Sequence, residues 1–221
     1  MISNNLIVIQ DKIKLALKHS GRDLDFCVLV GVSKTKSLSQ IKEAFNSGLK
    51  DFGENYVEEF TSKYNEYNPE GLNYHFIGRL PTKKVRKIVG NAQLIHSVSS
   101  LKLAKKIDFV ANEEGIIQDI LIQINQGAEF SKSGFGNDVD TYFEELLSLS
   151  HVKILGLMSI PPFSEPAKSF FILLRKLRDK LENKFSTKLP YLSMGMSGDF
   201  EEAIVEGSTH VRIGTLIFGR R

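Results

Sequence analysis

The sequence predicts an α/β fold, a single (β/α)8 TIM barrel with an extra helix before the first strand. Short apolar runs end in Gly, Ser, Thr, Asn or Lys, and each is followed by a segment with helical periodicity. In one run, 116–125, six of the ten residues are Ile or Leu, which is typical of a parallel strand buried on both faces. The alternative, a doubly wound open sheet, normally has a glycine-rich nucleotide turn after its first strand. The segment Gly31-Val32-Ser33-Lys34 is not such a turn.

Each expected element follows from its pattern. The amphipathic helix that opens the chain has apolar residues at helical spacing: Leu6, Ile9, Ile13 and Leu17. The apolar runs give strands at 27–33, 50–53, 74–77, 93–97, 116–125, 153–159, 189–193 and 209–213. The segments between them give helices at 39–47, 54–64, 81–89, 101–111, 139–149, 165–184 and 199–206. Pro161-Pro162 precedes the longest of these helices, and Asp199 with Glu202 predicts a capping box for the last one.

Composition limits the class of protein. With 42% hydrophobic and 25% charged residues, the chain can bury a full core. It contains no Pro/Gly/Ser-rich linker, so we expect one domain over residues 1–221. The net charge of +3 is weak and its basic residues are scattered, which argues against a nucleic-acid binder. The single cysteine, Cys27, fits a reducing compartment, and the first apolar run is too short for a signal peptide or membrane span. We therefore expect a cytoplasmic protein that does not contact membranes, and we expect a monomer.

Four strand ends contain residues suited to chemistry. They are Ser33-Lys34-Thr35, the segment 52–56, the segment 193–197 and the segment 212–215. In a barrel of parallel strands these ends converge on one face. Gly195, Ser197, Gly214 and Thr215 are residue types that hold a phosphate through backbone N–H groups and hydroxyls, as is common after the last two strands. Lys34 would lie across the mouth, positioned to form an imine with an aldehyde. A phosphate site facing a lysine is what pyridoxal 5'-phosphate (PLP) requires.

Motifs in this order resemble the YggS/PROSC family, the pyridoxal phosphate homeostasis proteins, which share the barrel of the alanine racemase fold type. The resemblance covers nearly the whole chain. It rests on the motifs 32–36, 52–57, 75–78, 121–125, 131–134, 156–158, 192–197, 211–215 and 218–219. It implies that Lys34 binds PLP as a Schiff base, the internal aldimine. It also implies a set of further cofactor-binding residues: Asn55 beside the ring, Arg212 facing the pyridine nitrogen, Ser193 or Ser197 with Gly214 and Thr215 at the phosphate, and Met196 nearby.

The sequence departs from the family pattern in two places. After Gly78 the family usually has Pro-Leu-Gln-Ser-Asn-Lys, and this chain has Arg79-Leu80-Pro81-Thr82-Lys83-Lys84, which puts a polar role of position 83 in doubt. After Ser197 the family usually has two acids, and this chain has Gly198-Asp199. Neither change touches Lys34 or Arg212.

Arg212 argues for limited reactivity. An arginine only donates hydrogen bonds, so it cannot keep the pyridine nitrogen protonated as a carboxylate would, and the ring becomes a weaker electron sink. The chain ends at Arg221, shortly after the eighth strand, so we expect no second domain that would supply a catalytic tyrosine. Tyr56 is the nearest candidate acid or base, and packing or hydrogen bonding is the simpler role for it.

The function expected from these residues is PLP storage, buffering or delivery, with apo PLP-dependent enzymes as acceptors and no catalytic residues assigned. Two alternatives remain open: a slow amino-acid racemase or related PLP enzyme of the same fold type, and a cofactor-free lyase that uses Lys34 on a sugar-phosphate carbonyl. The histidines share no ligand spacing, so no metal site is expected. His75 is expected at a strand end near the mouth. The loop 131–134 is either a lid or a solvated loop.

Overall fold

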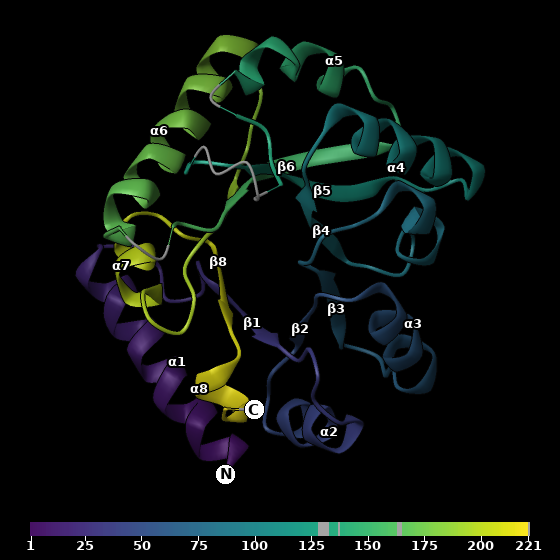
Figure 1. Ribbon diagram of the computed structural model, residues 1–221. Helices are drawn as coiled ribbons and strands as arrows, with labels where there is room; N and C mark the ends of the chain where they lie inside the picture. The colour runs from purple at the N-terminus through teal and green to yellow at the C-terminus, as the bar shows by residue number, and fades with distance from the viewer. Residues whose placement is uncertain (128–132, 137, 163–164, 221) are drawn as a thin grey trace.

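The computed structural model describes residues 1–127, 133–136, 138–162 and 165–220. Eight parallel strands close into a barrel in chain order, and β1 pairs with both β2 and β8 (Figure 1). The strands are β1 (Val28–Val32), β2 (Asp51–Glu54), β3 (Asn73–Phe76), β4 (Leu94–Val98), β5 (Gln118–Ile124), β6 (Val152–Ser159), β7 (Tyr191–Ser193) and β8 (His210–Ile213). The predicted (β/α)8 barrel is confirmed.

Helices surround the barrel because each buries an apolar face against the outer side of the strands. They are α1 (Ile2–His19), α2 (Leu38–Asn46), α3 (Val57–Glu66), α4 (Leu101–Glu113), α5 (Phe143–Leu147), α6 (Ala167–Phe185), α7 (Phe200–Val205) and α8 (Thr215–Phe218). The described residues also form two 3₁₀ helices, η1 (Thr82–Lys87) and η2 (Val139–Thr141). Within the described ranges, none of these helices is long and apolar enough to cross a membrane.

The predicted N-terminal helix, α1, is confirmed and connects the two ends of the chain. Its buried side chains include Leu6, Ile9, Ile13 and Leu17, the four positions that predicted it. Figure 1 shows α1, in purple, beside α7 and α8, in yellow. The Asn5 side chain donates a hydrogen bond of 2.9 Å to the Ile217 carbonyl oxygen. The first helix therefore supports the segment that follows the last strand.

Three local expectations are wrong. The basic helix expected over 81–89 is a 3₁₀ helix, η1, and the helix expected over 139–149 is divided into η2 and α5. The Asp199 side chain makes no cap bond to α7 and instead accepts the Met196 N–H at 2.6 Å. A capping box exists on α2, where Ser37 and Gln40 satisfy each other's backbone N–H groups.

The interior of the barrel is divided into an apolar and a polar half. Leu94, Leu121, Leu155 and Met158 form an apolar cluster contributed by β4, β5 and β6. The other half holds buried polar side chains: His75, His96, Ser193, His210 and Arg212. His75, expected at the mouth, is 3% exposed and its ring bonds His96 and Asp51 inside the barrel. The polar half leads to the strand ends that form the candidate site.

Candidate cofactor site

Lys34 lies at the mouth of the barrel, in the turn that follows the end of β1. A Cβ on Gly31 would overlap Leu49 on the outer side, and Ser33 bonds outward to Glu54. Side chains alternate along a strand, so Val30 and Val32 face inward just before this turn. The Lys34 side chain is half-buried, and its ammonium makes no hydrogen bond or ion pair with another described residue. The structure therefore presents an amine with no internal partner in the part of the chain that it describes.

A buried ionic cluster outside the barrel wall fixes the backbone on both sides of Lys34. We call it the Lys63 cluster: Lys63, Glu54, Glu59 and Ser33. The Lys63 ammonium donates hydrogen bonds of 2.7 Å to the Ser33 carbonyl oxygen and to both carboxylates. Glu54 accepts the Ser33 hydroxyl at 2.6 Å, and Glu59 accepts the Thr35 N–H at 2.5 Å. These bonds hold Thr35 at a φ of 64°, a value that non-glycine residues rarely adopt.

Asn55 follows β2 and faces the same mouth. Its Oδ1 atom is buried and has no hydrogen-bond partner among the described residues. Such an atom normally has a partner, so it is a suitable contact for a ligand. Gly78, after β3, allows this arrangement because a Cβ at that position would overlap the Asn55 carbonyl oxygen. The structure brings Asn55 and Lys34 to neighbouring strand ends, as the sequence predicts.

The loops after β7 and β8 contain the residues predicted to hold a phosphate. Gly195 adopts a φ of 92°, and a Cβ there would overlap the Ala203 side chain of α7. Gly214 lies against the end of β1, where a Cβ would come within 3.2 Å of the Val32 carbonyl oxygen. Ser197 and Met196 are half-buried and Thr215 is exposed. The β8 loop therefore lies directly beside the end of β1, the strand that precedes Lys34.

Arg212 and Ser193 are bonded to each other inside the barrel below these loops. The Arg212 guanidinium donates to the Ser193 hydroxyl at 2.6 Å and to the Ser159 carbonyl oxygen at 2.9 Å. Burial lowers the pKa of Arg212 to about 10, opposed by the nearby Asp199 carboxylate. An arginine with this pKa stays charged at neutral pH. Ser193 Oγ also bonds His96 Nδ1 at 2.8 Å, so the hydroxyl already has two partners.

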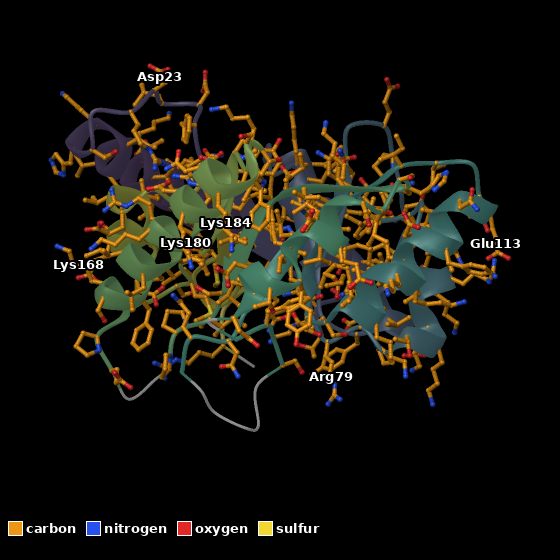
Figure 2. All side chains as sticks on the ribbon, turned by 90° about the horizontal axis from the view of Figure 1, so that it is seen from above. Asp23, Arg79, Glu113, Lys168, Lys180 and Lys184 are labelled. Carbon is orange, nitrogen blue, oxygen red and sulfur yellow. The ribbon has the colours of Figure 1, made fainter. Side chains whose placement is uncertain are left out.

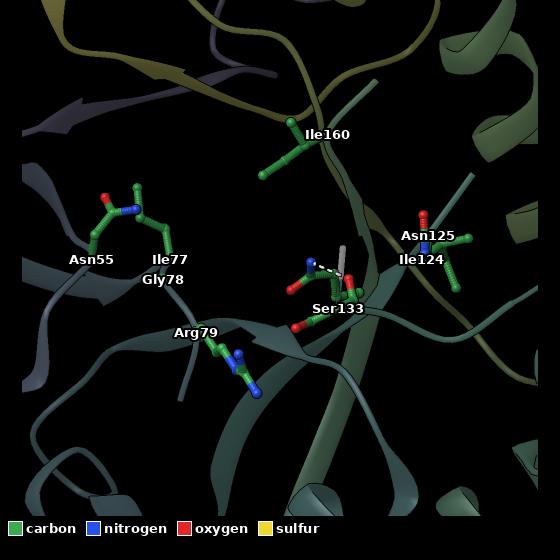
Figure 3. A pocket seen from close by; sticks show the side chains of 9 residues that line it. Asn55, Ile77, Gly78, Arg79, Ile124, Asn125, Ser133 and Ile160 are labelled. Carbon is green, nitrogen blue, oxygen red and sulfur yellow. Dashed lines mark hydrogen bonds between the residues drawn. The ribbon is translucent and has the colours of Figure 1, made fainter. Parts of the chain in front are cut away.

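A cavity of about 300 Å³ opens on the other side of the mouth (Figure 3). One wall consists of Asn55, Ile77, Gly78 and Arg79, and the opposite wall includes Asn125, Ser133 and Ile160. Gln123 also lines the cavity and bonds the Ser133 carbonyl oxygen. Figure 2 shows Arg79 at the edge of the molecule, in keeping with its exposed side chain. Sequence reasoning gave no role to Gln123 or Ile160. The signal for Gln123 was a polar residue between two isoleucines near the end of the strand.

The remaining sequence expectations have these outcomes. Ser131 and Lys132 of the loop 131–134, expected as either a lid or a solvated loop, lie outside the described residues. Ser133 is described, and its carbonyl oxygen accepts a hydrogen bond of 2.7 Å from the Gln123 side chain.

Tyr56, the candidate acid or base, is 51% exposed at the start of α3. Lys83 is exposed, and a Cβ at Gly198 would meet no atom within 4 Å, so both departures from the family pattern lie on open surface. Within the described ranges, no three His, Cys, Asp or Glu side chains gather as metal ligands.

Comparisons with known proteins agree with the barrel and with its strand-end motifs. The family model of the alanine racemase N-terminal domain matches residues 13–221. Alanine racemase from Clostridium difficile 630 superimposes with a TM-score of 0.77 at 16% identity, covering 99% of this chain and 57% of that enzyme. At that identity the likeness concerns the fold alone. The class of protein is thus a barrel of the alanine racemase fold type.

Closer relatives narrow the class. A pyridoxal phosphate homeostasis protein of Aquifex aeolicus is 46% identical over 215 residues, which cover 96% of this chain and 94% of the relative. Its Escherichia coli K12 counterpart is 38% identical over 228 residues, covering 100% and 97%. PipY of Synechococcus elongatus, solved with PLP bound, has a TM-score of 0.87 at 32% identity and covers 99% of this chain and 100% of PipY. The chain belongs to the YggS/PROSC family of pyridoxal phosphate homeostasis proteins.

Proposed function

We propose that this chain binds PLP covalently through Lys34 and acts in intracellular PLP homeostasis, as a store, buffer or delivery protein with little or no catalysis. One observation carries the proposal: a half-buried lysine without an internal partner among the described residues follows β1, and the end of β1 lies against Gly214 of the loop after β8. The relatives named pyridoxal phosphate homeostasis proteins, and the PLP-bound structure of PipY, support it. Lys34 Nζ adds to the aldehyde carbon, a C=N bond replaces C=O, and the oxygen leaves as water.

The other residues divide into phosphate and ring contacts. Ser197, Gly214 and Thr215 are assigned to the phosphate, with Met196 beside them. Ser193 is the weaker candidate, because its hydroxyl already accepts from Arg212 and bonds His96. Asn55 is assigned to the ring, which agrees with its buried and unpartnered Oδ1. When bound, PLP supplies an aldehyde for the amine and a pyridine ring that can accept electrons.

Arg212 keeps this chemistry limited. It is assigned to the pyridine nitrogen, and because it is a buried cation at neutral pH it offers that nitrogen only a hydrogen-bond donor. The ring then gains no proton and withdraws electrons weakly. Exchange of the Cα hydrogen of amino acids with solvent deuterium measures this property. We expect slow exchange; fast exchange that disappears in Lys34→Ala would establish a PLP enzyme instead.

Covalent capture tests the proposal directly. The purified protein is incubated with PLP, reduced with borohydride and digested, and we expect the phosphopyridoxyl group on the peptide containing Lys34. Lys36→Ala is the matched control, since Lys36 lies two residues away and its ammonium bonds the carbonyl oxygens of Phe218 and Gly219 at 3.3 and 3.2 Å. The visible imine absorption should survive in Lys36→Ala and disappear in Lys34→Ala. Labelling at another lysine, or at none, would refute the assignment.

Delivery is tested by mixing PLP-loaded protein with an apo PLP-dependent enzyme and an equal amount of free PLP in a parallel sample. Faster reactivation by the loaded protein supports transfer to acceptor enzymes, and equal reactivation after slow release supports storage alone. We also infer that the protein is a cytoplasmic monomer. Cell fractionation and light scattering test these two points.

A further inference from the structure

A row of hydrogen-bonded side chains crosses the interior of the barrel, and we call it the interior chain: Arg212, Ser193, His96, His75 and Asp51. Arg212 Nη1 lies 2.6 Å from Ser193 Oγ, and Ser193 Oγ lies 2.8 Å from His96 Nδ1. His96 Nε2 lies 2.9 Å from His75 Nδ1, and His75 Nε2 lies 3.0 Å from Asp51 Oδ1. The first four side chains are at most 4% exposed. These residues come from β8, β7, β4, β3 and β2, so the row runs from one side of the barrel to the other.

The two end groups and the charge of the rings between them decide the direction of the interior chain. Arginine has only donors, and an ionised carboxylate only accepts. Burial alone would raise the pKa of Asp51, but bonds from His75 and Asn73 hold it below its ordinary value, so the group is ionised at neutral pH. Burial lowers the pKa of His96 well below its ordinary value, so this ring is neutral. With His75 as a neutral ring, each link donates toward Asp51: Arg212 to Ser193, Ser193 to His96, His96 to His75 and His75 to Asp51.

This arrangement defines one tautomer for each histidine. His96 uses Nδ1 as the acceptor for the Ser193 hydroxyl and therefore carries its hydrogen on Nε2. His75 accepts that hydrogen at Nδ1 and donates from its own Nε2. Every link presents its negative end toward Arg212, and linked bonds of one direction polarise one another. Arg212 has no carboxylate within ion-pair distance among the described residues, so beside the more distant Asp199 carboxylate the interior chain connects it by hydrogen bonds to the negative charge of Asp51.

We propose that Asp51, His75 and His96 are positioning residues for the cofactor site: they keep Ser193 Oγ as an acceptor for Arg212 and so hold the guanidinium in one orientation at the base of the mouth. The effect on a ligand rests on the proposed function, while the direction of the chain does not. Asp51 lies at the start of β2, and its side chain is 21% exposed, so the carboxylate end opens at the face of the barrel opposite Lys34.

A metal site is the other use of such a cluster, and the geometry speaks against it. The ring nitrogens of His75 and His96 face each other, Ser193 and Asp51 in pairs and do not converge on one point. His210, whose ring centroid lies 5.7 Å from that of His96, directs Nδ1 to Thr209 Oγ1 at 2.8 Å. The three rings therefore fill the polar half of the barrel as bonded or stacked groups.

The direction of the interior chain is tested without any ligand. Long-range ¹H–¹⁵N spectra of histidine-labelled protein at neutral pH should show His75 and His96 as neutral rings protonated on Nε2. Comparison with His96→Asn, which places an amide oxygen near the former Nδ1 position, assigns the signals. A ring protonated on Nδ1, or a charged ring, at either position overturns the proposed direction.

Asp51→Asn tests the positioning role. The amide removes the charge and can donate as well as accept, so we expect a mixture of tautomers at His75 and His96. The dissociation constant for PLP should rise about threefold to tenfold, the size of one net hydrogen bond, and the imine absorption should shift. The control is Asp119→Asn, a carboxyl near the start of β5 with no histidine partner, which should change neither quantity.

The two proposals fail in different ways. If Asp51→Asn changes the tautomers but not PLP affinity or absorption, the interior chain only fills the barrel and the positioning role is wrong. If wild-type protein binds no PLP while the tautomers are as expected, the proposed function is wrong and the direction of the interior chain stands.

If Asp51→Asn does not fold, the variants His96→Asn and His96→Leu replace it. His96→Asn keeps an acceptor for the Ser193 hydroxyl and should therefore bind PLP more tightly than His96→Leu. Equal binding by the two would overturn the positioning role.

Discussion

Two lysines beside the same strand end, Lys34 and Lys63, have opposite environments. The Lys63 side chain is 7% exposed and gives all three of its N–H donors to protein oxygens. Lys34 is half-buried and its ammonium has no partner among the described residues. A buried ammonium with three acceptors is a structural group, whereas an amine without acceptors is available to react. Lys63 therefore forms the cluster that fixes the backbone on both sides of Lys34.

The largest expected effect is the loss of stability when Lys63 is replaced. Lys63→Met leaves Glu54 and Glu59 without their cation in a buried place, and we expect the free energy of unfolding to fall by about 3–5 kcal/mol. Lys34→Met removes no interaction with a described residue, so the change should stay within about 0.5 kcal/mol. Denaturation by urea measures both. A larger loss for Lys34→Met than for Lys63→Met would contradict the division between a structural and a reactive lysine.

The second effect concerns the opposite wall of the mouth. In Gly78→Ala the new Cβ would overlap the Asn55 carbonyl oxygen, and the backbone must shift. We expect a loss of stability of about 1–3 kcal/mol, with weaker PLP binding because Asn55 is displaced. Gly198→Ala, where the space is open, is the control and should stay near the wild type. Unchanged PLP affinity in Gly78→Ala would separate Asn55 from the binding site.

The architecture was predictable because it depends on local and repeated signals. Apolar runs followed by helical periodicity gave eight strands in the right order, and Leu6, Ile9, Ile13 and Leu17 gave the first helix. Strand ends in a parallel barrel meet on one face, so Lys34, Asn55 and Gly214 could be brought together without coordinates. Capping was less predictable, because the Asp199 carboxylate found a better-placed donor in the Met196 N–H.

The Lys63 cluster and the interior chain could not be predicted in the same way. Lys63 and Glu54 belong to α3 and β2, and only the packing of that helix on the barrel shows that they share a buried site. His75 was expected at the mouth because it lies near a strand end, but its bonds to Asp51 and His96 place its ring inside the barrel. Both features depend on contacts between distant segments, which the periodicity of one segment does not contain.

A third effect is the pH dependence of two carboxyls at the two ends of β2. Burial raises the pKa of Glu54 in spite of Lys63, so the folded protein binds the proton more tightly than the unfolded chain. Its contribution therefore favours folding below its ordinary pKa of 4.5 and is lost as the pH rises through the higher folded value. The pKa of Asp51 is lowered, so its contribution is present above its ordinary 3.8 and is lost as the pH falls through the lower folded value.

Urea denaturation of Glu54→Gln and Asp51→Asn between acid and neutral pH measures the two signs. On acidification, the stability of the wild type relative to Glu54→Gln should rise, and its stability relative to Asp51→Asn should fall. If the stability of the wild type falls on acidification relative to both variants, then burial does not raise the pKa of Glu54 in the Lys63 cluster.

The smallest expected loss of stability comes from Ser37, and it tests whether the Lys63 cluster fixes the segment after Lys34 independently of α2. Ser37→Ala removes the hydroxyl that accepts the Gln40 N–H, and we expect a loss of about 1 kcal/mol, typical of an N-cap. Ser39→Ala is the control, because that hydroxyl bonds only the Ser37 hydroxyl among the described residues. The Lys34 imine absorption should be unchanged in both, since the Lys63 cluster holds Ser33 and Thr35 independently of α2. If Ser37→Ala reduces the imine absorption, then the start of α2 also positions Lys34. The Lys63 cluster would then not hold Ser33 and Thr35 independently of α2.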